Sequence, residues 1–210
     1  MAKYGILKSS TNTGLDTELI AAFSAPLSIT SRKPSLVTET LTLKRKTAYT
    51  DIQRLEIQTG LVPLADASQM FMHNVVNGYS ESFYVRMPQI YRAKNLPNTL
   101  SPIVFANTAV ATSTLNIAGL GGLILPVGEF IKFASHSKVY MIKESSLLGD
   151  NVNTINIFPG LINPITINEN VSYGTKVTMA AKYGDDNQIG VTYQDGILAQ
   201  YDSLSLIEAL

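Results

Sequence analysis

The sequence predicts a mainly β, α+β fold: a small antiparallel β-barrel or β-sandwich with one packed α-helix and a second β-rich half. Three observations lead to this prediction. Short segments alternate polar and apolar residues, with turn residues between them. Aromatic and β-branched residues are frequent in these segments, as is usual in strands. One stretch has its apolar residues at helical spacing, and a second, residues 51–58, mixes spacings of two and three and so leaves a helix open beside the favoured strand.

The first half is predicted to hold three strands and this helix. The strands are expected at residues 36–43, 51–58 and 82–87, the last of which ends at Pro88. The helix is expected at residues 64–77, because Asp66 and Ser68 suit its first turn and Asn77-Gly78 suits its end. We interpret it as an amphipathic helix that caps a sheet.

The second half is predicted to be nearly continuous β-structure. Strands are expected at residues 112–117, 129–134, 138–143, 154–158, 177–183 and 189–193. The second and third of these strands are expected to form one hairpin, and the last two another. Residues 91–107 have two prolines and no clear period, which indicates a long loop. The predicted organisation is therefore residues 1–95, a connection at 96–107 and a barrel or sandwich at 108–210, or else one continuous domain.

The composition points to a surface that other protein chains cover. Only 15% of the 210 residues are charged while 45% are hydrophobic, against about 25% charged residues in ordinary soluble domains. Surfaces buried in assemblies are poor in charge, although a β domain with a surface rich in Ser, Thr and Asn would also fit. Sixteen basic and sixteen acidic residues leave no net charge, so specific nucleic-acid binding is not expected.

Other classes of protein are disfavoured by what the sequence lacks. There is no cysteine, which excludes disulfides and thiol nucleophiles. No apolar run reaches the length of a membrane-spanning helix, and the polar amino end does not resemble a signal peptide. We therefore expect no membrane insertion and synthesis in the cytoplasm.

No residue pattern indicates catalysis, a metal or a cofactor. His73 and His136 have no neighbouring partner with the spacing of a metal site or a catalytic triad. The glycines at 119–122 are followed by Pro126 rather than by a helix start, unlike a dinucleotide-binding loop. The carboxylates are scattered, without the pairing that a glycoside hydrolase needs. The chain is expected not to be an enzyme.

Candidate assembly residues come from the basic cluster and from the two ends. Lys44, Arg45 and Lys46 form the main basic cluster, with Arg32 and Lys33 nearby. Such a cluster is usually the solvated end of a strand, but it could also steer assembly or face a lumen through which DNA passes. Residues 5–23 and 201–210 are expected to reach neighbouring subunits. In the second of these ranges, the candidate contact residues are Leu204, Leu206 and Leu210.

Several segments together resemble a module of tail and baseplate proteins of tailed bacteriophages. They are residues 50–59, 83–88, 128–133, 138–142 and 155–161, within a resemblance that covers residues 47–177. Leu55 stands where the module usually has Trp, and Glu129 where it usually has Asp. The resemblance implies a structural component of the virion tail, made in the host bacterium and assembled as a homo-oligomeric ring around the tail tube or baseplate hub with other tail proteins.

Two other classes of function remain open. One is a head-to-tail connector, or a tail-tip module that binds a receptor or glycan through an aromatic groove including Tyr84, Tyr91 or Tyr140. The other is an enzyme such as a wall-degrading hydrolase, which would need a cleft with paired carboxylates.

Overall fold

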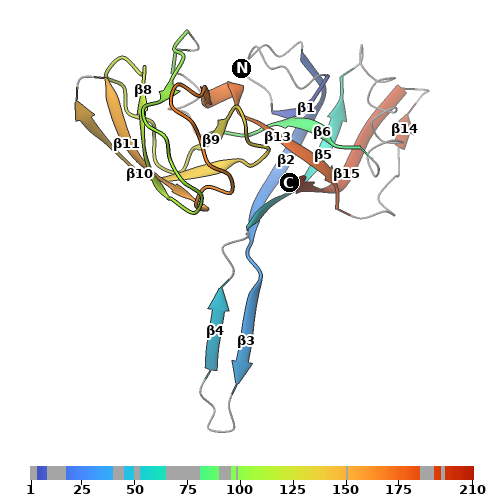
Figure 1. Ribbon diagram of the computed structural model, residues 1–210. Coiled ribbons are helices and arrows are strands. Elements are labelled where there is room, and N and C mark those ends of the chain that lie inside the picture. Colours follow the sequence, from blue (N-terminus) through green and yellow to red (C-terminus); the bar gives the residue numbers. More distant parts are fainter. Residues whose placement is uncertain are drawn as a thin grey trace.

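The structure of the chain is a computed structural model that describes residues 4–8, 18–39, 45–49, 53–64, 81–89, 96–97, 99–149, 151–184, 192–194 and 197–210. The described residues form a mainly β fold, as predicted. Its strands make two rolled sheets that lie side by side, with a long two-stranded arm projecting from one of them (Figure 1).

Six antiparallel strands form a closed barrel, because β13 pairs with β6 on one side and with β15 on the other. In order around the barrel they are β13 (Thr178–Tyr183), β6 (Phe83–Arg86), β1 (Gly5–Leu7), β2 (Leu19–Arg32), β5 (Arg54–Pro63) and β15 (Ile197–Glu208). β14 (Thr192–Gln194) pairs with the start of β15. The predicted strands at 51–58 and 82–87 are thus confirmed over the parts that β5 and β6 occupy.

The long strand β2 is irregular where it contains a proline. Its register with β5 shifts between Ser24 and Ser28, and Pro26 lies inside this interval. Proline cannot donate a hydrogen bond to a neighbouring strand, so it is tolerated at a bulge of this kind. Beyond the bulge, β2 continues to Arg32, directly opposite Arg54 of β5.

A second sheet of six strands forms the other lobe. In order they are β12 (Val171–Ser172), β9 (Phe130–Phe133), β10 (Tyr140–Gly149), β11 (Val152–Phe158), β8 (Thr114–Ala118) and β7 (Ile103–Val104). The two edges of the sheet meet, because Ile103 bridges to Asn170 next to β12. Burial alternates along β8, β9 and β11, which is the expected consequence of one face packing on a core.

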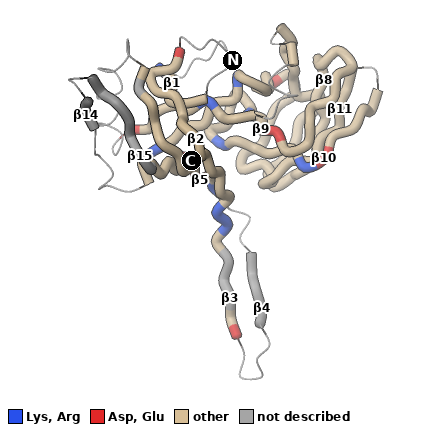
Figure 2. Tube along the Cα trace, turned by 180° about the vertical axis from the view of Figure 1, so that it is seen from behind, with Lys and Arg blue, Asp and Glu red and all other residues tan. Residues whose placement is uncertain are grey.

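β3 (Ser35–Glu39) and β4 (Arg45–Tyr49) make up the arm. They pair with each other in antiparallel register from Ser35↔Tyr49 to Glu39↔Arg45. In both views the arm stands away from the two lobes (Figures 1 and 2). The predicted strand at 36–43 is confirmed as far as Glu39, and the rest of it lies outside the described residues.

One prediction about local structure is wrong, and another falls outside the described residues. The expected hairpin between 177–183 and 189–193 is wrong in its pairing: β13 pairs with β6 and β15, whereas β14 pairs with β15. The expected helix at 64–77 finds no support, since all of it except Leu64 lies outside the described residues. Within the described residues, helical geometry is confined to Glu18 and to the 3-10 turn η3 (Gly174–Lys176).

The two cores show how the chain is divided between the lobes. Buried side chains from Val104 to Tyr173 form the core of the second lobe. The barrel core combines side chains from both ends of the sequence, among them Ile6, Leu61 and Leu206. The expected connection at 96–107 includes strand β7 of the second lobe, and the range 108–210 is shared between the lobes because β13 and β15 return to the barrel.

Candidate assembly site at the junction of the lobes

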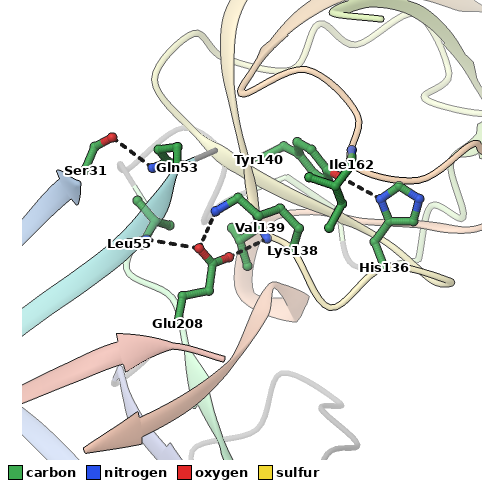
Figure 3. Close-up of polar contacts among 9 residues, drawn as sticks. All are labelled: Ser31, Gln53, Leu55, His136, Lys138, Val139, Tyr140, Ile162 and Glu208. Atoms are coloured by element: carbon green, nitrogen blue, oxygen red, sulfur yellow. Dashed lines mark hydrogen bonds and ion pairs between the residues drawn. The ribbon is translucent and has the colours of Figure 1, made fainter. Parts of the chain in front are cut away.

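A buried ion pair joins the two lobes. The ammonium of Lys138 contacts the carboxylate of Glu208, and both side chains are fully buried. Glu208 also accepts hydrogen bonds from the backbone N–H of Leu55 (3.0 Å) and of Val139 (2.9 Å) (Figure 3). Glu208 ends β15, Leu55 lies at the start of β5, and Lys138 and Val139 precede β10. One carboxylate thus holds together three segments that are remote in the sequence.

This ion pair is a structural contact. Burial lowers the pKa of Lys138, and the neighbouring carboxylate of Glu208 opposes that shift by favouring the charged ammonium. A buried carboxylate is tolerated when its oxygens accept several hydrogen bonds, and removal of its partner is then costly. The pair therefore fixes how the barrel meets the second lobe.

A second polar contact, between Gln89 and Phe130, also joins the two lobes. The side chain of Gln89 donates to the carbonyl of Phe130 (3.1 Å) and accepts from its N–H (2.9 Å). Gln89 follows β6 of the barrel and Phe130 begins β9 of the second lobe. This two-way contact satisfies both backbone groups of Phe130, so it also ties the lobes together.

A small apolar hollow of about 170 Å³ lies between the lobes, next to the ion pair. Gln53 lines it and donates a hydrogen bond from Nε2 to Oγ of Ser31 (2.9 Å; Figure 3). The Oε1 atom of Gln53 is buried and has no hydrogen-bond partner among the described residues. Buried polar atoms in proteins usually have a hydrogen-bond partner, which is either protein or ordered water.

A larger groove opens at the root of the arm. It consists of two adjoining hollows of about 550 and 790 Å³, which share Lys33 and Leu210. Four cationic side chains line the groove, and they are Arg32, Lys33, Arg54 and Lys143. No aspartate or glutamate side chain is among the described residues that line it. We call this feature the arm-root groove.

His136 is packed in the second lobe. Its Nδ1 atom lies 2.7 Å from the hydroxyl of Tyr140, which also accepts a hydrogen bond from the N–H of Ile162 (3.2 Å; Figure 3). Burial lowers the pKa of His136 and raises that of Tyr140 to about 12. Both rings contact Phe133, so we interpret His136 and Tyr140 as residues that pack in the core of this lobe.

The predicted assembly residues fall into three groups. Lys44 lies outside the described residues, and Arg45 and Lys46 lie in β4 of the arm. Leu204 and Leu206 are buried in the barrel core, so they stabilise the barrel and cannot reach a neighbour. Leu210 is exposed over 61% of its surface and lines the arm-root groove.

The amino-terminal range 5–23 is described at its two ends only, since residues 9–17 lie outside the described residues. Ile6, Ile20 and Ala21 are buried in the barrel core because β1 and β2 are barrel strands. Sequence reasoning also missed Arg54 and Lys143 as parts of a common groove. The only signal for Arg54 is its register opposite Arg32, which strand pairing reveals and sequence does not.

The described residues contain no group of three or more His, Asp or Glu side chains that could hold a metal ion. His73 lies outside the described residues. No helix in the described part of the chain is long and apolar enough to cross a membrane. In comparisons with known proteins, no protein-family model and no curated sequence match this chain.

Proposed function

We propose that this protein is a structural subunit of a tailed-bacteriophage tail, in the tail tube or baseplate hub region, and that it acts through contacts with other subunits rather than through catalysis. The observation that carries the proposal is the character of the second lobe. Nine of the eleven large hydrophobic side chains that are exposed in the described residues lie between residues 105 and 167. Residues 95–128 contain no charged side chain at all.

This surface suits burial against protein. Figure 2 shows β8 and β11 without an acidic or basic residue. Apolar side chains such as Phe105, Ile124 and Leu148 are between 47% and 64% exposed. Contiguous uncharged and apolar surface commonly marks an interaction site, and charged residues are depleted at the centres of interfaces.

The arm supports the proposal independently. Among the described residues, β3 and β4 have no paired strand other than each other. A two-stranded ribbon is at best marginally stable in water, and its open edges can pair with another chain. Contact with a neighbouring subunit would supply further strand pairing to the edges of the arm.

The aromatic-groove alternative finds less support. Tyr140 is fully buried, Tyr84 is partly buried with the ammonium of Lys132 over its ring, and Tyr91 lies outside the described residues. The connector alternative uses the same subunit contacts, so it differs from our proposal in the position of the protein within the particle.

The test is to locate the protein and to remove the arm. Purified phage particles are examined by mass spectrometry and by immunogold labelling, and we expect the protein in the tail. A variant in which Asn-Gly joins Lys33 directly to Gln53 replaces the arm with a hairpin turn, because Arg32 and Arg54 are already paired. We expect this variant to keep its circular dichroism spectrum and to lose particle incorporation.

One control accompanies this variant. The substitution Gly149→Ala, at the last residue of β10 where an added Cβ has open space, should assemble normally. Absence of the protein from particles, or unchanged incorporation of the armless variant, contradicts the proposal.

A further inference from the structure

The apolar hollow between the lobes has the size of a binding site for a small molecule. Its volume is about 170 Å³, and an apolar cavity of about 150 Å³ can hold one aromatic ring. Six of the eight described residues that line it are apolar. Two of the six lie on barrel strands and four lie on or next to β9, β10 and β11; in chain order they are Ile29, Leu55, Phe130, Val139, Met141 and Phe158. A molecule in the hollow would therefore contact both lobes.

The walls of the hollow are held in place by the contacts that join the lobes. Leu55 and Val139 line the hollow, and both donate their backbone N–H groups to the carboxylate of Glu208 (Figure 3). Phe130 is fixed through its backbone N–H and carbonyl groups by the side chain of Gln89. Because these segments are fixed by the fold itself, the hollow is formed before a ligand arrives, as is usual for small-molecule sites.

One buried polar atom at the hollow is available to a ligand. Gln53 is only 4% exposed, and its Nε2 atom donates to Oγ of Ser31 (2.9 Å; Figure 3). Its Oε1 atom has no hydrogen-bond partner among the described residues. A buried acceptor without a partner costs free energy, because it has lost its hydrogen bonds to water. A donor group on a ligand would remove this cost.

An ordered water would be held only weakly in the hollow. A buried water usually makes about three hydrogen bonds, whereas the described lining side chains offer it only Oε1 of Gln53 and the hydroxyl of Ser31. That hydroxyl already accepts a hydrogen bond from Gln53. Displacement of a poorly held water by an apolar group increases affinity. A ligand that fills the apolar part of the hollow and donates to Oε1 would therefore be favoured over water.

We propose that the hollow binds a small apolar molecule of about one or two rings that carries a single N–H or O–H donor, with this donor directed at Oε1 of Gln53. Phenols, aromatic alcohols and indoles belong to this chemical class. Gln53 and Phe158 line both the hollow and the arm-root groove, so the ligand enters from the groove. Because the bound molecule contacts both lobes, it stabilises their junction by mass action. This inference goes beyond the proposed function and does not depend on it.

The experiment titrates the full ¹⁵N-labelled chain with indole and with indene and follows the amide signals by NMR. The two probes have nearly the same fused-ring shape, but only indole has an N–H donor. We expect saturable binding of indole with a dissociation constant of about 1 mM or below. The largest shifts should occur at the amides of residues that line the hollow, such as Leu55, Val139 and Met141.

The substitution Gln53→Met tests the role of the acceptor, because it removes Oε1 and keeps the length of the side chain. The ratio of indole affinity to indene affinity should be about tenfold higher in the unmodified chain than in this variant, since only indole uses the acceptor. Gln58→Met is the matched control, because Gln58 is exposed on β5 and does not line the hollow. Its affinity ratio should equal that of the unmodified chain.

The substitution Leu55→Phe tests the place of binding, because it enlarges a side chain that lines the hollow. It should weaken the binding of both probes by about tenfold or more. Thermal melts verify that each variant is folded, and if Leu55→Phe is not, the comparison of Gln53→Met with Gln58→Met decides alone. Three results would overturn the inference: no saturable shift at the lining residues, an equal affinity ratio in the unmodified chain and Gln53→Met, or shifts confined to the exposed apolar surface at residues 105–127.

Discussion

The ion pair between Lys138 and Glu208 gives the sharpest prediction about stability. The substitution Lys138→Met keeps most of the side-chain volume and removes the ammonium. The carboxylate of Glu208 then stays fully buried and keeps only the two backbone donors of Leu55 and Val139. The carboxylate has lost its charged partner but remains buried, so the folded state is destabilised relative to the unfolded chain.

The magnitude follows from the burial of both partners. Removal of one member of a buried ion pair destabilises proteins by about 3–5 kcal/mol, out of a total free energy of unfolding of roughly 5–15 kcal/mol. With a urea dependence of about 2 kcal/mol per molar, the unfolding midpoint should fall by about 1.5–2.5 M. The matched control Lys143→Met removes an exposed lysine and should change the free energy of unfolding by no more than about 0.5 kcal/mol.

The assay is urea unfolding followed by circular dichroism, completed as a double-mutant cycle. Glu208→Gln removes the negative charge and keeps an acceptor oxygen for one of the two backbone donors. The double variant with Lys138→Met should lose less stability than the sum of the two single losses, and the difference is a coupling energy of about 1–3 kcal/mol. If Lys138→Met is as stable as Lys143→Met, or the coupling is zero, the pair does not hold the lobes together and our reasoning is refuted.

Three further predictions concern other parts of the fold. Burial lowers the pKa of His136, so the unfolded chain binds the proton more readily than the folded chain. The free energy of unfolding should therefore fall by up to about 1.4 kcal/mol per pH unit as the pH falls below about 6.5. Urea unfolding of His136→Gln should lack this pH-dependent contribution. Gly5→Ala should strongly lower the melting temperature, because the added Cβ would lie 1.9 Å from a backbone oxygen of β2. Gly149→Ala has open space around the added Cβ and should melt at the normal temperature. Deletion of residues 201–210 removes the part of β15 that pairs with β5 and β13, so amide NMR spectra should show loss of the barrel; an unchanged barrel spectrum would contradict the topology.

Much of the strand content could be predicted from the sequence, because alternation is a local signal. The strands β8, β9 and β11 each bury every second residue, and the period of two is visible in the sequence without any knowledge of the partner strands. The hairpin of β9 and β10 was also predictable, since its strands are neighbours in the sequence, and it is confirmed by the pairing of Ile131 with Tyr140.

The pairing of distant strands could not be predicted in this way. β15 closes the barrel by pairing with β5, more than a hundred residues earlier in the chain. Leu204 and Leu206 are therefore core residues, although a short apolar stretch near a chain end equally suits a docking segment. A single sequence shows that such a stretch must be covered, but not by which strand.

The candidate site depended even more on pairing. Arg32 and Arg54 are 22 positions apart, and they share Glu56 only because β2 and β5 run side by side to the root of the arm. Lys143 reaches the same groove from the other lobe. The sequence indicated Lys44, Arg45 and Lys46 because they are contiguous. The cationic side chains that line the groove come from separate parts of the chain.

The buried ion pair and the arm-root groove are physically coupled. Leu55, which donates to Glu208, directly follows Arg54 of the groove, and Glu208 lies two residues before Leu210. The contact that fixes the junction therefore also fixes the shape of the groove. A partner that binds only the folded groove must stabilise the junction by mass action, so assembly and subunit stability are linked. Lys138→Met tests that link by loosening the junction, whereas Lys143→Glu changes the groove's charge and leaves the buried pair intact.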